Sequence, residues 1–187
     1  DAPAIALADV NGDGRADLLR GDCGGMVSIV DNIGAVAGTA TGASLAMPAG
    51  PCGGVHARDF DGDGSVDLAS FANYQASTAL TVRFQLPANQ WSSPNTLGVP
   101  GNPAFSGHFG TPIDIGNDGL VDFVVSGGGN SPTNLHLYRQ QVPGVIDAGV
   151  PFATYDIPET IKAEDLDGDE RAHAADVDDA GQSGIGF

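Results

Sequence analysis

The chain has 187 residues and a formal net charge of −17, with 24 acidic residues against seven Lys and Arg. So few basic residues, with no basic patch among them, exclude a nucleic-acid partner, because phosphates need cationic neutralisation. No apolar run reaches about 18 residues, so the sequence predicts no membrane insertion through a helix.

Short strands are the elements that the chain predicts throughout. Four apolar segments each run directly into an aspartate, at residues 4–8, 54–58, 111–113 and 160–164. Alternating segments follow at residues 26–30, 80–86 and 135–139. β-Branched and aromatic residues in period-two alternation, bounded by Gly and Pro, are typical of strands. No long stretch has a capped helical period, so we expect an all-β chain.

A nine-residue acidic loop joins these predicted strands and occurs four times. The copies begin at Asp9, Asp59, Asp114 and Asp165, which are 50, 55 and 51 residues apart. A period of this length indicates repeated supersecondary units. Oxygen-bearing side chains fall at positions 1, 3, 5 and 9 of the pattern, with glycine at position 6. Such donors in a tight turn suit Ca²⁺, which takes about six to eight oxygens.

The first two loops are complete candidate calcium sites. In the first, the expected ligands are the side chains of Asp9, Asn11, Asp13 and Asp17 and the carbonyl of Arg15. In the second, they are the side chains of Asp59, Asp61, Asp63 and Asp67 and the carbonyl of Ser65. Glycine at position 6 permits the sharp bend that brings these oxygens together.

The other two loops depart from the pattern. The third has Gly116 at position 3, so a water or Asn117 would have to complete the shell. Its remaining expected ligands are Asp114, Asp118, the Leu120 carbonyl and Asp122, and we expect weaker binding. The fourth keeps Asp165, Asp167 and Asp169 but replaces the glycine by Glu170 and the last carboxylate by His173. We therefore interpret the fourth loop as degenerate.

The acidic loops have two alternative interpretations, an ordinary turn and an EF-hand. Asp, Asn and Gly also form ordinary turns that bind no ion, although four periodic copies argue against this. An EF-hand would need a glutamate at position 12 and flanking helices. The residues at that position are Arg20, Ser70, Val125 and Asp176, so the EF-hand is excluded.

The loops and their flanking strands resemble the FG-GAP repeats of integrin α-subunit propellers and the similar VCBS repeats of secreted proteins. Phe109-Gly110, just before the third loop, matches the first half of the FG-GAP motif. The resemblance implies β-propeller blades of four strands each. The repeats would span about residues 1–50, 51–104, 105–157 and an incomplete 158–187. Three blades and a partial fourth imply a segment of a larger propeller, a set of copies that complete one another, or an open stack.

The resemblance also implies a function. We expect a secreted, extracellular or cell-surface module for binding or adhesion, the periplasm being the alternative compartment, with structural calcium ions. Its partner would be a protein or carbohydrate ligand, or further blades of the same or another chain. The ligand-binding loops implied, on the face opposite the calcium hairpins, are residues 20–25, 72–77, 99–107 and 127–134.

Two rival functions remain open. One is a secreted, lyase-like enzyme acting on polysaccharides, whose base and cations would have to come from Arg58, Arg83, Arg139, Lys162 and the four histidines. No nucleophile elbow, zinc-protease or phosphate-loop motif is present, so the sequence favours binding over catalysis and assigns no catalytic residue. The other rival is a structural subunit of a surface filament or assembly, whose open edge a neighbour would pair.

Three smaller features have two interpretations each. Cys23 and Cys52 are expected to form a disulfide that stabilises by about 3–4 kcal/mol, the alternative being two buried thiols. Arg20-Gly21-Asp22 is either an adhesion motif or a turn. The aromatic residues Tyr74, Trp91 and Tyr155 could stack on sugars or pack between blades.

Overall fold

A computed structural model describes most of the chain. The described residues are 4–31, 42–48, 54–71, 78–98, 106–128, 135–152, 160–164 and 173–177. They form eighteen strands and a single 3₁₀ turn, so the predicted all-β class is confirmed. The strands assemble into three four-stranded antiparallel sheets and three two-stranded ones.

The first blade is a four-stranded meander. It contains β1 (Ile5–Ala8), β2 (Asp17–Gly21), β3 (Met26–Val30) and β4 (Gly42–Ala46), paired in chain order. The first acidic loop joins β1 to β2, whose register pairs Ala8 with Asp17. In β3 buried and half-buried residues alternate, as expected for a strand that presents one face to a core.

The second and third blades repeat this meander. The second contains β5 (Gly54–Arg58), β6 (Asp67–Phe71), β7 (Thr78–Arg83) and β10 (Asn95–Gly98). The third contains β11 (Ser106–Ile113), β12 (Asp122–Gly128), β13 (Leu135–Tyr138) and β16 (Val150–Phe152). In both blades an acidic loop again joins the first two strands.

A small hairpin interrupts the second and third blades between their last two strands. In the second blade, β8 (Gln85–Leu86) pairs with β9 (Gln90–Trp91) across the 3₁₀ turn Pro87–Asn89. In the third blade, β14 (Gln140–Val142) pairs with β15 (Val145–Ile146). The sequence did not predict these hairpins: the strand expected over residues 80–86 ends at Arg83, and a new one begins at Gln85.

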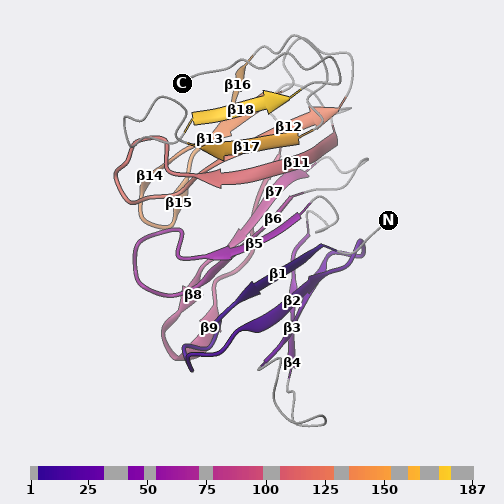
Figure 1. The fold of residues 1–187 in the computed structure, drawn as a ribbon, viewed down its shortest axis with the longest axis vertical. Coiled ribbons are helices and arrows are strands. Elements are labelled where there is room, and N and C mark those ends of the chain that lie inside the picture. The colour runs from indigo at the N-terminus through magenta and orange to yellow at the C-terminus, as the bar shows by residue number, and fades with distance from the viewer. Residues whose placement is uncertain are drawn as a thin grey trace.

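The blades lie face to face in an open row within the described part of the chain (Figure 1). The first strands of successive blades, β1, β5 and β11, contact one another. They are followed by β17 (Thr160–Glu164), which pairs with β18 (His173–Val177). The first blade and the β17–β18 pair occupy opposite ends of the row (Figure 1). This stacking of antiparallel sheets fits propeller blades.

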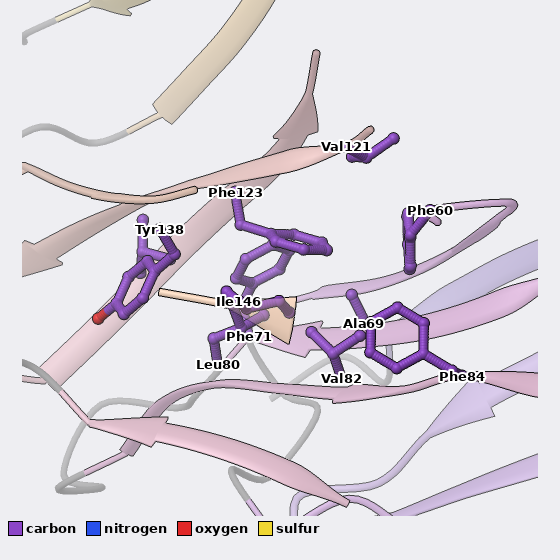
Figure 2. Close-up of a cluster of buried hydrophobic side chains, with 11 residues drawn as sticks. Phe60, Ala69, Phe71, Leu80, Val82, Phe84, Val121, Phe123, Tyr138 and Ile146 are labelled. Atoms are coloured by element: carbon purple, nitrogen blue, oxygen red, sulfur yellow. The ribbon is translucent and has the colours of Figure 1, made fainter. Parts of the chain in front are cut away.

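The largest core cluster fills the space between the second and third blades (Figure 2). Its rings meet edge to face: the Phe60 and Phe123 centroids are 5.1 Å apart at 76°. The second blade contributes Phe60, Ala69, Phe71, Leu80, Val82 and Phe84, and the third contributes Val121, Phe123, Val125, Tyr138 and Ile146. Aromatic pairs of this geometry add to the free energy gained by burying their area.

Successive side chains of a strand point to opposite faces, so the two faces of a blade pack against different neighbouring blades. In β6, Leu68 packs in the cluster shared with the first blade, whereas Ala69 and Phe71 pack in the cluster shared with the third. The cluster shared with the first blade includes Val10, Leu19, Val27, Ile29, Met47, Val55 and Leu68. Trp91 packs against this cluster, which supports the packing interpretation of that aromatic residue.

The outer face of the first blade exposes two apolar residues of β1. Ile5 is 62% exposed and Leu7 60%. These residues precede the first loop by four and two positions, as Val55 and Ala57 precede the second loop. Val55 and Ala57 pack against the first blade. The side of β1 that carries Ile5 and Leu7 therefore faces outward, whereas the equivalent side of β5 is packed against a neighbouring blade.

Gly110 is the point of closest approach between the second and third blades. A Cβ built on Gly110 would lie 2.1 Å from the Phe71 ring. No side chain fits at that distance, so the glycine of the Phe109-Gly110 pair is required by the neighbouring blade.

Replacing this glycine should therefore destabilise the interface. We expect Gly110→Ala to lower the free energy of unfolding by about 1–3 kcal/mol through overpacking, measured by urea denaturation. In a Phe71→Leu background, which makes room for the methyl group, the same replacement should cost less. Equal costs in the two backgrounds would show that the contact with Phe71 is not the cause.

Candidate metal centre

The three described acidic loops share one backbone conformation. Positions 4 and 6 have positive φ in each loop: 74° and 82° at Gly12 and Gly14, and 79° and 88° at Gly62 and Gly64. In the third loop, Asn117 and Gly119 have 50° and 82°. Glycine enters this region freely and Asn is the residue that tolerates it next best, which explains why these residue types recur.

The first aspartate of each loop organises the turn. Asp9 accepts hydrogen bonds from the Gly12 N–H at 2.8 Å and the Gly14 N–H at 2.7 Å. Asp59 accepts the equivalent bonds in the second loop, both at 2.8 Å. Asp114 accepts from Asp118 at 3.2 Å and from Gly119 at 2.9 Å. Each turn is thus held by its own carboxylate and backbone.

The last aspartate of each loop is buried under the turn. Asp17, Asp67 and Asp122 are at most 2% exposed. Their Oδ2 atoms accept from the N–H groups at position 2, those of Val10, Phe60 and Ile115, at 2.9, 2.9 and 3.3 Å. These side chains therefore fix the loop to the first residues of the second strand.

Burial changes the ionisation of two of these carboxylates, Asp67 and Asp122. Desolvation raises the pKa of Asp67 to about 6, with a smaller contribution from the negative charges of Asp61 and Asp63. Desolvation likewise raises the pKa of Asp122, against the opposing charge of Arg139. A bound cation would favour the ionised form of both side chains.

The second loop brings three carboxylates together. One oxygen from each of Asp59, Asp61 and Asp67 lies within 4.8 Å of the others, a separation that a metal ion could bridge. Asp63 lies on the same turn and accepts from the Ser65 N–H at 2.7 Å. In a set made only of hard oxygen donors, Ca²⁺ fits better than a transition metal.

The first loop differs from the second only in one donor. Asn11 stands where the second loop has Asp61, and its Oδ1 accepts from the Asp13 N–H at 3.0 Å. Asp13 accepts in turn from the Arg15 N–H at 2.9 Å. The amide oxygen is neutral, so this loop offers one negative charge fewer to a cation than the second loop does.

The third loop has lost a donor and gained a neighbouring cation. Asn117 lies at position 4, equivalent to Gly12 and Gly62, and its side chain is exposed. Arg139 Nε lies 3.7 Å from Asp122 Oδ2. Arg139 Nη2 would also be 3.4 Å from a Cβ at Gly116. The position that supplies Asp61 in the second loop is therefore empty of oxygen and next to a positive charge.

Of the remaining predicted ligands, Leu120 is among the described residues and the three aspartates of the fourth loop are not. Leu120 donates its N–H to Asp118 at 3.0 Å, as Arg15 and Ser65 do to the equivalent aspartates. Asp165, Asp167 and Asp169 lie outside the described residues, although β17 and β18 flank them.

Two further sequence features are resolved by the turn after β2. Asp22 accepts at Oδ1 from the Gly24 N–H and the Met26 N–H, so the acidic residue of Arg20-Gly21-Asp22 closes a turn. Cys23 is disulfide-bonded. The sequence has one other cysteine, Cys52, which lies outside the described residues.

Comparison with known families supports the repeat interpretation. The family model for the FG-GAP-like repeat matches residues 4–70. This segment of the chain is similar to that repeat, and we call it the FG-GAP-like segment. It extends from the residue before β1 to the penultimate residue of β6 and contains the first two acidic loops, including the carboxylate group of the second. No curated protein matches the chain.

Within the described part of the chain, no helix is long and apolar enough to cross a bilayer. The strands of the FG-GAP-like segment are β1–β5 and most of β6.

Sequence reasoning missed two residues of the centre, Gln85 and Gln140. Each donates its backbone N–H at 2.8 Å to the Oδ1 atom of the last aspartate in its own blade, Asp67 or Asp122. Both glutamines lie 18 residues after that aspartate. This constant offset is the signal that could have identified them.

The third loop provides a test of the ligand geometry. Gly116→Asp should strengthen calcium binding at this loop by about tenfold or more. It supplies the missing charged donor at position 3, and its negative charge offsets the positive charge of the nearby Arg139. The measurement is a calcium titration that follows the Gly119 amide by NMR. Gly116→Ala is the matched control and should not gain affinity. Equal affinities for the two variants would mean that position 3 does not face the ion.

Proposed function

We propose that this chain is a calcium-binding β-propeller module that acts outside the cell as a binding or adhesion unit. The observation that carries the proposal is the convergence of Asp59, Asp61 and Asp67 in a loop within the FG-GAP-like segment. The ions would be structural, because the loops join the first two strands of each blade.

The affinity should differ from loop to loop. The second loop offers four aspartates, the first loop three aspartates and an amide, and the third loop three aspartates beside Arg139. We therefore propose strong sites at the first two loops, a weaker one at the third, and none of consequence at the fourth. Charge count and rigidity both set the affinity of calcium sites for their ion.

The extracellular placement follows from the resemblance to FG-GAP repeats of surface proteins and from the disulfide at Cys23. Disulfides persist mainly in oxidising compartments, and millimolar extracellular calcium would saturate even a weak site. The loops that connect strands on the face opposite the calcium hairpins would bind the protein or carbohydrate ligand, because loops vary freely on a fixed scaffold.

Calcium removal tests the central claim. Chelation should lower the melting temperature, because an ion that binds only the folded state stabilises it by about 2.7 kcal/mol at a concentration one hundred times its Kd. Asp59→Asn with Asp61→Asn should abolish one bound ion in equilibrium dialysis. Asp147→Asn, which removes a charge outside the loops, is the control and should leave the stoichiometry unchanged. A melting temperature that does not respond to chelation would reduce the loops to ordinary turns.

A second role, assembly with a further blade, is favoured by the outer face of the first blade, on which Ile5 and Leu7 are exposed. Ile5 and Leu7 occupy positions whose equivalents in the second blade pack against a neighbouring blade. The partner proposed for this face is another blade of the same repeat type, supplied by a second copy of the chain. Exposed apolar patches on an otherwise polar surface mark interaction sites.

Self-association tests this second role. Sedimentation velocity should detect concentration-dependent association of the purified chain, and Ile5→Thr with Leu7→Thr should weaken it at least about tenfold, since two apolar anchors are lost. Threonine keeps the strand propensity of β1. Val145→Thr, at an exposed apolar residue of β15, is the control. A purely monomeric wild-type chain at high concentration would contradict assembly between copies.

A further inference from the structure

Gln85 and Gln140 each bridge two acidic loops that belong to adjacent blades. The backbone N–H of Gln140 donates to Asp122 of the third loop, while its side-chain Nε2 donates to the Phe60 carbonyl of the second loop at 2.7 Å. Gln85 does the same one blade earlier: its backbone donates to Asp67, and its Nε2 donates to the Val10 carbonyl at 2.9 Å. Both side chains are buried, at 7% and 1% exposure for Gln85 and Gln140.

The Gln140 amide has a partner for each of its polar atoms. Nε2 also lies 3.3 Å from the Val121 carbonyl, and Oε1 accepts from the Gly144 N–H at 2.8 Å. Carbonyls on one side and an N–H on the other fix the orientation of the amide. Because a buried amide without these partners would be costly, the side chain is held in this one position.

The bridged backbone atoms are close to the expected ligands. Phe60 lies between Asp59 and Asp61, so a shift of its carbonyl moves both carboxylates of the second loop. The Val121 N–H, in the third loop, also donates to the Phe60 carbonyl, at 3.0 Å. A Cβ at Gly144, in the β14–β15 turn, would lie 3.8 Å from Asp61 Oδ2. Hydrogen bonds from the third blade therefore restrain the backbone of the second loop.

We propose that Gln85 and Gln140 are positioning residues that couple the calcium sites of adjacent blades, so that an ion in one loop raises the affinity of the next. The coupling rests on the proposed calcium binding. An ion at the third loop would fix Asp122 and with it the Gln140 backbone. The side chain then fixes the Phe60 carbonyl, so the second loop loses less freedom when it binds its own ion.

The test is a double-mutant cycle on calcium affinity. The affinity of the second loop is read from the Gly62 and Gly64 amides by NMR, in a chain whose first loop is disabled by Asp9→Asn and Asp13→Asn. The third loop is then disabled by Asp114→Asn and Asp118→Asn. We expect this to weaken the second loop about fivefold or more when Gln140 is present, and less than about twofold with Gln140→Met. Methionine keeps the volume of the side chain and removes its hydrogen bonds.

Two controls separate coupling from general destabilisation. Gln141→Met alters the neighbouring exposed residue, whose side-chain Nε2 donates to Asp147 at 3.1 Å, and should leave the coupling intact. Gln85→Met should preserve the coupling between the second and third loops and, in a chain whose first loop is intact, should abolish that between the first two. It also serves as the test if Gln140→Met does not fold. A loss of stability alone would lower the affinity in every background and would leave the ratio unchanged.

The outcomes separate the two proposals. An equal effect of the third loop in the Gln140 and Gln140→Met chains, or no effect in either, would overturn the coupling while leaving calcium binding established. If the second loop binds no calcium in the otherwise unmodified chain, both proposals are wrong.

Discussion

A buried carboxylate at the end of each of the first three acidic loops is the interaction on which the structure depends. Asp17, Asp67 and Asp122 sit under their turns and accept from the backbone at position 2 of the same loop. In the second and third blades the same carboxylate also accepts from the first residue of the inserted hairpin, Gln85 or Gln140. One side chain thus joins the loop, the second strand and the start of the inserted hairpin. An uncompensated charge there would cost several kcal/mol, so these hydrogen bonds, and a cation where one binds, are required.

The interfaces between blades follow from this anchor. Once the loop is fixed, the residues on either side of it alternate between the two neighbouring blades, and Phe60 and Phe123 meet edge to face. The close approach at Gly110 lets the Phe71 ring lie against the backbone of the third blade. Tyr138 adds a hydrogen bond from its hydroxyl to the Gly98 carbonyl of the second blade, at 3.0 Å. Apolar packing and backbone anchoring therefore act on the same boundary between blades.

Sequence reasoning succeeded where the information is local. The turn of each of the three described acidic loops depends on glycine or asparagine at position 4 and glycine at position 6, and these residues can be recognised without knowing what surrounds them. Strand alternation predicted the first strand of each blade, although β11 begins five residues before the predicted segment 111–113. The β8–β9 and β14–β15 hairpins were missed because strands of two or three residues have no detectable period.

The same limit explains the contacts that sequence reasoning could not supply. The pair formed by Gln85 and Val10 spans 75 residues, and that formed by Gln140 and Phe60 spans 80. Arg139 directly follows β13, and nothing in its local sequence places it beside Asp122. Contacts of this separation are set by how one blade stacks on the next, since neither partner is constrained by its own segment.

The sequence by itself determined the β class, the repeat, and the residues that give each loop its turn, because backbone sterics and side-chain alternation act over a few residues. Only the tertiary structure decided which carboxylates converge and which loop lies next to a cation. It also decided that a glutamine of one blade holds the loop of the blade before it. Those properties depend on distances between segments far apart in the chain, and these distances exist only after the blades have stacked.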